Sequence, residues 1–262
     1  MTIMAALFAT VIMPPGFARA RGATDQGDYV VLLHGMGRTT RSMKKLEQRF
    51  AADGFRVVNL AYPSTRAPIE TLATRYLGPA LAARCRRPDR KIHFVTHSLG
   101  GIVLKYYLND NALPNLGRVV MLSPPNQGSE LADRWRGNIL YRFFTGPAGQ
   151  QLGTAPSGLS NRLRAVTFEL GVITGNRSLN PWTSRIIPGA DDGKVAVARA
   201  KAEGMQDFLV VPRSHTLIMR DPEAISQALF FIHNGRFKKD RINNPRMEYS
   251  FKCRSTPSWR PH

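Results

Sequence analysis

Residues 91–101 read Lys-Ile-His-Phe-Val-Thr-His-Ser-Leu-Gly-Gly, and this stretch decides the fold of the chain. The apolar run 92–95 is typical of a buried strand, and residues 102–108 favour a helix. Ser98 therefore stands in a sharp turn between strand and helix, a layout that exposes a serine hydroxyl. Residues beside such a turn must be small; Gly100 is small, whereas Thr96 is larger than the glycine expected there. The alternative is an ordinary strand, turn and helix with a surface serine.

A second motif, His34-Gly35-Met36-Gly37, follows the apolar run Tyr29–Leu33. A run without polar residues favours a strand that is buried on both faces of a parallel sheet. The glycines after it allow backbone N–H groups to turn toward a substrate oxygen, and two such donors are needed to bind an oxyanion. The N–H groups of Met36 and Leu99 are the natural pair. A plain turn at the end of a strand is the alternative for this motif alone.

Acidic and histidine residues follow two later segments. Asp191 and Asp192 lie in a turn rich in glycine, and His215 follows the apolar run 208–211. A serine hydroxyl needs a histidine to take its proton, and that histidine needs a carboxylate to orient it. The chain order of serine, aspartate and histidine matches one of the known arrangements of such groups and differs from the two protease orders.

Taken together, these motifs resemble those of α/β-hydrolases of the lipase and esterase type, over residues 28–235. The resemblance implies Ser98 as nucleophile, Asp192 as the acid and His215 as the general base. It also implies that the backbones of Met36 and Leu99 form the oxyanion hole.

The resemblance also bears on neighbouring residues. It favours Asp192 over Asp191, because the acid in relatives directly precedes the glycine of an Asp-Gly-x-Val turn, although the residues alone leave both open. It implies that residues 123–129, which resemble a Pro-x-x-Gly-Ser stretch, shape the pocket through structural serines. His93 fits the interior of its strand as a core histidine. Four further residues are expected to support the site without reacting: His34, Gly35, His97 and Gly100.

The pattern of apolar segments predicts one α/β domain with a mostly parallel central sheet and helices on both faces. This is the architecture that the resemblance implies, the α/β-hydrolase fold. Expected strands are 29–33, 56–60, 92–95, 116–122 and 208–211, and expected helices are 40–53, 68–85 and 102–108. Residues 130–180 break this alternation, and we predict a small cap or lid there.

Both ends of the chain differ from the centre. The first twenty residues are apolar from Ile3 to Met13 and end in Ala18-Arg19-Ala20, which predicts a secretory signal and a secreted or periplasmic protein. The absence of basic residues at the start leaves a cytoplasmic protein as the alternative. Residues 236–262 carry eight Lys or Arg against two acids, and we expect a flexible basic tail.

Composition limits the partners. The 262 residues carry a formal charge of +19, which predicts weak attraction to anionic surfaces. No nucleic-acid-binding module is recognisable, so no specific nucleic-acid binding is expected. No spacing of His, Cys, Asp and Glu suggests a metal, and no phosphate-binding glycine motif suggests a nucleotide cofactor. We expect a monomer without cofactors that acts on a small or lipid ester.

The leading functional hypothesis is therefore a serine carboxylic-ester hydrolase, an esterase or lipase. An acyltransferase, a thioesterase or an amidase would use the same groups, and the sequence does not separate them. A non-catalytic basic binding protein on this fold is the alternative of a different class.

Overall fold

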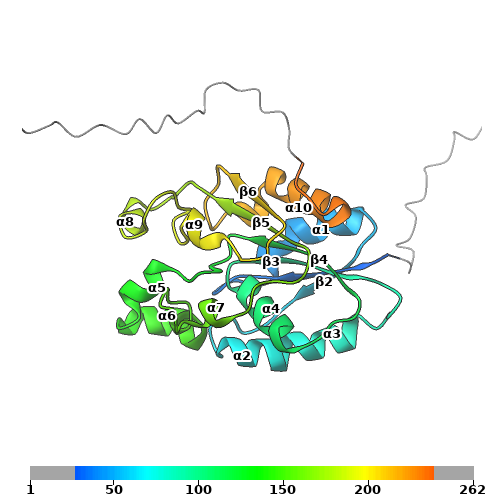
Figure 1. Cartoon of the computed structure of the whole chain (residues 1–262), viewed down its shortest axis with the longest axis horizontal. Helices are drawn as coiled ribbons and strands as arrows, with labels where there is room; N and C mark the ends of the chain where they lie inside the picture. The colour runs from blue at the N-terminus through cyan, green and yellow to red at the C-terminus, as the bar shows by residue number, and fades with distance from the viewer. Residues whose placement is uncertain (1–26, 239–262) are drawn as a thin grey trace, which may run out of the picture.

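Six strands form one parallel sheet in the order β2-β1-β3-β4-β5-β6 (Figure 1). The structure is a computed structural model that describes residues 27–238. The strands are β1 (Tyr29–Leu33), β2 (Arg56–Leu60), β3 (Ile92–His97), β4 (Leu116–Leu122), β5 (Leu170–Gly175) and β6 (Asp207–Val211). Every neighbouring pair is parallel, which confirms the predicted sheet.

Helices cover both faces of the sheet, as Figure 1 shows. One face carries α1 (Lys44–Ala52) and α10 (Pro222–Asn234); the other carries α3 (Gly78–Arg84) and α4 (Leu99–Asp110). The remaining helical segments are η1 (Thr40–Met43), α2 (Ile69–Thr71), η2 (Leu72–Leu77), α5 (Glu130–Trp135), α6 (Ile139–Gln150), α7 (Leu159–Arg162), α8 (Pro181–Ser184), α9 (Val197–Ala200) and η3 (Ile218–Arg220).

Strand β1 shows why its sequence is wholly apolar. Successive side chains of a strand point to opposite faces. Tyr29, Val31 and Leu33 pack into the core on the α4 side, while Val30 and Leu32 pack into the core beside α1 and α10. Both cores consist of buried apolar side chains, so a polar side chain on either face of the strand would lose its hydrogen bonds to water without a replacement.

The predicted helix over residues 68–85 is not regular. It consists of α2, η2 and α3, and η2 is a π-helical stretch in which the Gly78 N–H donates to the carbonyl of Ala73. Pro79 follows directly and has no N–H to donate. The missing donor explains why the ordinary hydrogen-bond pattern gives way here to a wider turn.

The predicted cap over residues 130–180 extends too far. Its end contains β5, a fully buried strand that pairs with both β4 and β6. The short run holds two glycines, which hide its strand character in the sequence. Gly171 has a packing reason, because a Cβ there would lie 2.6 Å from the ring of Phe231. The helices α5, α6 and α7 fill the remaining insertion, and a lid role for them stays a prediction.

The predicted tail also begins too early. Gly235 ends α10 with a left-handed φ of 72°, and Phe237 then returns to the core beside Phe231. The backbone N–H of Phe237 donates to a carboxylate oxygen of Asp207 at 2.8 Å. The chain therefore belongs to the domain up to Lys238. The rest of the predicted tail and the predicted signal over residues 1–20 lie outside the described residues.

The turn between β3 and α4 brings helix and strand into close contact. Ser98 adopts φ 52° and ψ −122°, a strained conformation for a residue with a side chain. A Cβ on Gly100 would lie 2.7 Å from the carbonyl oxygen of Leu33 and 2.9 Å from that of His34. Glycine is therefore required at position 100 for α4 to begin against the end of β1.

Gly100→Ala should lower the free energy of unfolding by about 2 kcal/mol, because the added methyl group meets backbone oxygens that cannot move aside. Gly137→Ala is the matched control, since no atom lies within 4 Å of its added Cβ. That variant should stay within about 0.5 kcal/mol of the parent. Urea unfolding measures both, and equal stabilities of the two variants would contradict the packing argument.

Candidate active site

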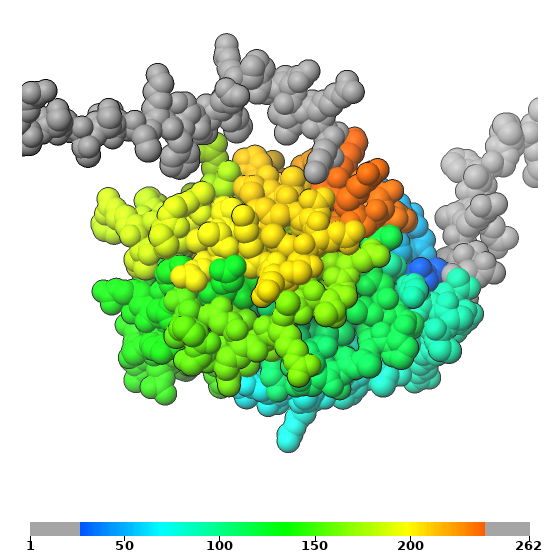
Figure 2. Space-filling model, in the orientation of Figure 1, coloured from blue at the N-terminus to red at the C-terminus, as the bar shows by residue number. Residues whose placement is uncertain are grey.

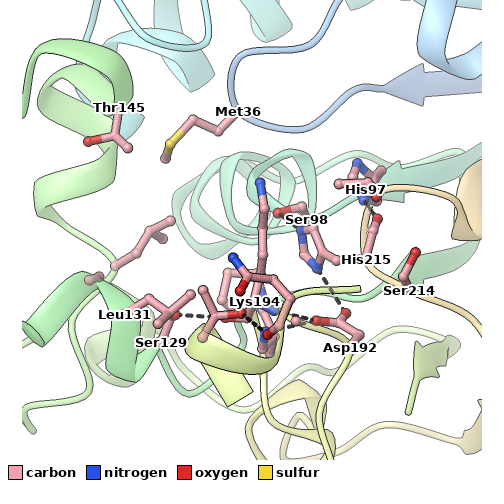
Figure 3. A pocket seen from close by; sticks show the side chains of 18 of the residues that line it. Met36, His97, Ser98, Ser129, Leu131, Thr145, Asp192, Lys194, Ser214 and His215 are labelled. Carbon is pink, nitrogen blue, oxygen red and sulfur yellow. Dashed lines mark hydrogen bonds and ion pairs between the residues drawn. The ribbon is translucent and has the colours of Figure 1, made fainter. Parts of the chain in front are cut away.

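Three side chains from separate loops meet at the carboxyl ends of the strands (Figure 3). The Nε2 atom of His215 lies 2.9 Å from the Oγ atom of Ser98. On the other side of the ring, Nδ1 of His215 lies 2.8 Å from Oδ2 of Asp192. Ser98 follows β3, Asp192 lies in the connection after β5 and His215 follows β6. The structure thus brings together the three residues that the sequence singled out.

The Asp192 carboxylate determines the state of the imidazole. A carboxylate accepts hydrogen bonds, so Nδ1 of His215 carries the proton and Nε2 is left to accept from the Ser98 hydroxyl. The other carboxylate oxygen, Oδ1, accepts from the backbone N–H groups of Lys194 at 3.0 Å and Val195 at 2.8 Å. These bonds fix the carboxylate in the geometry that the imidazole requires.

Two opposing effects act on the pKa of Asp192. Burial raises the pKa, while the adjacent His215 and the Val195 N–H lower it and prevail, so the pKa lies below its ordinary value. Asp192 is therefore ionised at neutral pH although its side chain is buried. A charged acceptor stabilises a positive charge on the imidazole more than a neutral one would.

The neighbouring Asp191 makes different contacts. Its Oδ1 accepts from the Ser184 hydroxyl at 2.9 Å and from the Gly193 N–H at 2.7 Å. Asp191 thus stabilises its own turn, whereas the carboxylate of Asp192 contacts His215. The choice that the residues alone left open is decided by the direction in which each side chain points.

Thr96, the departure from the usual small residue before the serine, is fully buried. A second glycine in α4 makes room for it: a Cβ on Gly101 would lie 3.2 Å from the Thr96 hydroxyl oxygen. The consecutive glycines at 100 and 101 therefore have separate roles. Gly100 faces the end of β1, and Gly101 accommodates the threonine.

His97 supports the site from behind. Its Nε2–H donates to the backbone carbonyl of His215 at 2.9 Å, and the two rings lie 5.0 Å apart. Burial, and then the positive charge that His215 can carry, lower the pKa of His97 well below its ordinary value. A neutral His97 places no second positive charge beside His215 and holds its backbone in position.

His34 and Gly35 shape the loop that faces the serine. The buried ring of His34 stacks on Tyr62 at 4.3 Å, and the Tyr62 hydroxyl donates to the His34 carbonyl. Burial lowers the pKa of His34. A Cβ on Gly35 would lie 2.7 Å from His97 and 3.2 Å from Ser98, so this glycine allows the loop to approach the serine.

The two expected oxyanion donors lie beside the serine in different elements. Leu99 begins α4, where the first N–H groups of a helix lack partners within the helix. Met36 lines the cavity in front of Ser98, opposite Asp192 in Figure 3. The next N–H, that of Gly37, is already engaged by the Ser64 hydroxyl at 3.1 Å. The Met36 N–H therefore stays the expected donor from this loop.

A cavity of about 380 Å³ opens at Ser98 and His215. Much of its wall is apolar, and the side chains come from the loops and from the insertion, among them Leu131, Trp135, Tyr141 and Leu152. Its size is at the small end for pockets that bind organic ligands. The cavity therefore accommodates an apolar group next to the serine hydroxyl.

Two cations of this cavity, Arg38 and Lys194, were not identified from the sequence. Lys194 sits in the same turn as Asp192, and Arg38 follows the loop of Met36. Desolvation and then Arg38 lower the pKa of Lys194, against the opposing effect of Asp192. Isolated basic residues in a chain this basic give no sequence signal that would distinguish them.

The predicted pocket-shaping segment, residues 123–129, contacts the acid turn. The Ser129 hydroxyl donates to the Lys194 carbonyl at 2.9 Å, and Pro125 lines the cavity. Ser123 is buried and has a positive φ of 48°, which the sequence does not reveal. This segment follows β4 in the chain, and its hydrogen bond holds it against the turn that contains Asp192.

A half-buried serine next to a buried imidazole and a buried carboxylate, at the carboxyl edge of a parallel sheet covered on both faces, is the fold and site of a class of hydrolases. Residues 30–250 match the Alpha/beta hydrolase family, and the chain belongs to this family. The predicted fold class is thereby confirmed. No curated protein sequence matches the chain.

Solved structures resemble the chain at low sequence identity. The mature lipase BlEst2 of Bacillus licheniformis matches with a TM-score of 0.58 and 17% identity, over 76% of this chain and 89% of that one. The metagenomic carboxyl esterase MGS0156 matches with a TM-score of 0.60 and 18% identity, over 80% of this chain and 71% of that one. The phospholipase PlaB of Legionella pneumophila matches with a TM-score of 0.57 and 21% identity, over 72% of this chain and 53% of that one. At these identities the likeness shows the fold.

Two features are absent from the part of the chain that the structure describes. Between residues 27 and 238, no group of three or more His, Cys, Asp or Glu side chains is placed to hold a metal ion. Over the same range, none of the helices has the length and apolar character needed to cross a membrane.

The buried neutral histidines predict that acid destabilises the fold. Because the pKa of His97 is lowered from 6.5, the unfolded chain binds this proton at a higher pH than the folded chain does. The free energy of unfolding should fall as the pH drops below about 6.5, by up to about 1.4 kcal/mol per pH unit for each such histidine.

His97→Gln removes one of these groups, so its free energy of unfolding should depend less steeply on pH between 7.5 and 5.5. Some dependence should remain, because burial also lowers the pKa values of His34 and His93. Urea unfolding at a series of pH values measures the slopes. Equal slopes for the variant and the parent would contradict a buried neutral His97.

Proposed function

We propose that the protein is a carboxylic-ester hydrolase that works through an acyl-enzyme intermediate. One observation carries the proposal: the chain of hydrogen bonds from Ser98 through His215 to the ionised Asp192. A serine hydroxyl is a weak nucleophile, and an imidazole that accepts its proton activates it. The strained turn at Ser98 favours the same role, because strain of this kind is maintained where the surrounding structure holds a reactive group in place.

The first half of the reaction acylates the serine. His215 Nε2 takes the proton from the Ser98 hydroxyl while Oγ attacks the ester carbonyl. The resulting imidazolium is stabilised by the Asp192 carboxylate. Collapse of the tetrahedral intermediate breaks the bond to the alcohol, which leaves with the proton that His215 returns. The second half repeats these steps with water, which releases the acid and restores Ser98.

The oxyanion of each tetrahedral intermediate needs donors that are already in position. The N–H groups of Met36 and Leu99 are the proposed pair, and each donor of this kind is worth roughly 3 kcal/mol of barrier. Gly35 and Gly100 support the role, because their lack of a side chain brings both segments next to Ser98.

An ester is the favoured substrate for two reasons. The cavity at Ser98 is largely apolar, which suits an acyl chain. The similar structures bear the names of a lipase, a carboxyl esterase and a phospholipase, and all three names denote ester hydrolysis. Transfer to another acceptor, or cleavage of a thioester or amide, would use the same groups and stays an alternative.

The proposal includes a setting for the enzyme. We propose a secreted or periplasmic monomer that needs no cofactor, with a cytoplasmic protein as the alternative. The insertion of α5, α6 and α7 contributes Trp135 and Tyr141 to the cavity wall, which supports a role as a lid.

Ser98→Ala should abolish turnover of p-nitrophenyl esters and covalent labelling by a fluorophosphonate. The variant loses the only atom that attacks, while its smaller side chain fits the same turn. The melting temperature should stay close to that of the parent. Acetate, butyrate, octanoate and palmitate esters, assayed in parallel, measure the preferred acyl length. Serine-independent turnover by a folded variant would overturn the proposal.

Asp192→Asn should reduce kcat roughly ten-thousand-fold, because an amide favours the wrong imidazole tautomer and provides no charge. Asp191→Asn is the matched control in the same turn, since an amide oxygen can still accept from Ser184 and Gly193. Its kcat should change by less than about tenfold. Steady-state kinetics with p-nitrophenyl butyrate measure both, and a larger loss in the Asp191 variant would reverse the assignment.

A further inference from the structure

Large apolar side chains are exposed on two segments beside the cavity. We call them the rim face; it consists of Trp135, Ile139, Leu140, Phe143, Phe144, Leu179 and Trp182. The exposed fractions are 80% for Ile139, 78% for Phe143 and 73% for Trp182. Single exposed apolar residues are common on soluble proteins, whereas a group of this size marks a surface that binds a partner protein or a membrane.

Helix α6 packs so that its large apolar residues of the rim face point to solvent. Tyr141 and Thr145 are half-buried on its inner side, while the apolar residues on either side of them point to solvent. Gly146, with a φ of 62°, then interrupts the helix. A Cβ at this glycine would lie 1.7 Å from the Thr65 carbonyl, so the kink is fixed against that loop. The exposure therefore follows from how the helix is anchored.

Within the two segments that carry the rim face, every charged residue is an arginine. Residues 134–147 and 176–188 contain no Asp or Glu, and they contain five exposed arginines: Arg134, Arg136, Arg142, Arg177 and Arg185. Arg136 approaches the preceding Asp133 at 3.9 Å, and the Arg185 guanidinium lies 4.8 Å from the ring of Trp182. Aromatic and aliphatic side chains among arginines suit the boundary between lipid headgroups and acyl chains.

The rim face borders the cavity on two sides, where Trp135 and Leu179 belong both to the rim face and to the cavity wall. Trp135 and Tyr141 line the cavity from the α5–α6 side, and Leu179 and Thr183 line it from the α8 side. In Figure 1 both groups of helices lie at the left end of the molecule. Figure 2 shows them as two lobes, α5 and α6 in green and α8 in yellow-green. Anything bound to this face would therefore lie next to the entrance that leads to Ser98.

We propose that the rim face docks on the surface of a bilayer that contains anionic lipids. The apolar side chains enter the boundary between headgroups and acyl chains, and the arginines contact phosphate groups. A second copy of this chain is a poor occupant, because a symmetric dimer would place the same arginines against one another. Docking goes beyond ester hydrolysis and needs no chemistry, so the two proposals stand or fall separately.

The test uses the full chain with Ser98→Ala, so that no lipid is consumed. Co-sedimentation with phosphatidylglycerol vesicles should show binding at low salt. Pure phosphatidylcholine vesicles should bind at least about tenfold more weakly, because the arginines then lack an anionic partner. The added double substitution Phe143→Ser and Phe144→Ser should weaken binding to phosphatidylglycerol by about tenfold or more.

The matched control is Val210→Ser, which removes an apolar side chain that is 38% exposed on β6, outside the rim face. It should leave binding to phosphatidylglycerol unchanged. When Ser98 is kept intact, the variant with Phe143→Ser and Phe144→Ser should turn over soluble p-nitrophenyl butyrate at the parental rate, because neither phenylalanine lines the cavity.

Three results would overturn the proposal. The first is the absence of vesicle binding. The second is vesicle binding that the double substitution leaves unchanged, which would assign the binding to basic residues elsewhere in the chain. Sedimentation velocity could also reveal a dimer that the double substitution dissociates, which would assign the rim face to self-association.

Discussion

The close packing of the end of β1 against the start of α4 is the constraint on which the rest of the site depends. Gly100 lets helix and strand meet, and Gly35 lets the loop after β1 approach Ser98. A side chain at either position would separate the two segments that hold the serine and the proposed oxyanion donors. Thr96 fits into the same turn because Gly101 leaves space for it, so a larger residue before the serine does not open the turn.

Asp192 and His97 are both buried beside His215, yet they differ in charge. Asp192 is buried and ionised, because two backbone N–H groups and His215 offset the loss of water. His97, which is equally buried, is kept neutral by its lowered pKa. One permanent negative charge therefore faces one imidazole that can become positive. This asymmetry is what proton transfer from a serine hydroxyl requires.

The insertion between β4 and β5 and the connection around α8, after β5, contrast with the rest of the fold. The sheet and its covering helices bury most of their large apolar residues, whereas α6 and the segment around α8 expose theirs beside the cavity. Apolar exposure lowers stability in water, so such residues are more readily explained by what they contact outside the chain. The cavity and the rim face together place the serine close to an apolar surface.

The sequence by itself determined the class of fold and pointed to the three candidate reactive groups. Alternating apolar runs predicted the parallel sheet, and turn residues next to Ser98, Asp192 and His215 marked the strand ends, because such signals lie in neighbouring residues. It missed β5, whose glycines hide a strand, and the return of Phe237 to the core. Only the tertiary structure decided that Asp192 and not Asp191 faces His215, that His97 holds the backbone of His215, and that α6 turns its apolar side outward. These features depend on how side chains from segments far apart in the chain are oriented toward one another. The pattern of residues within one segment does not predict that orientation.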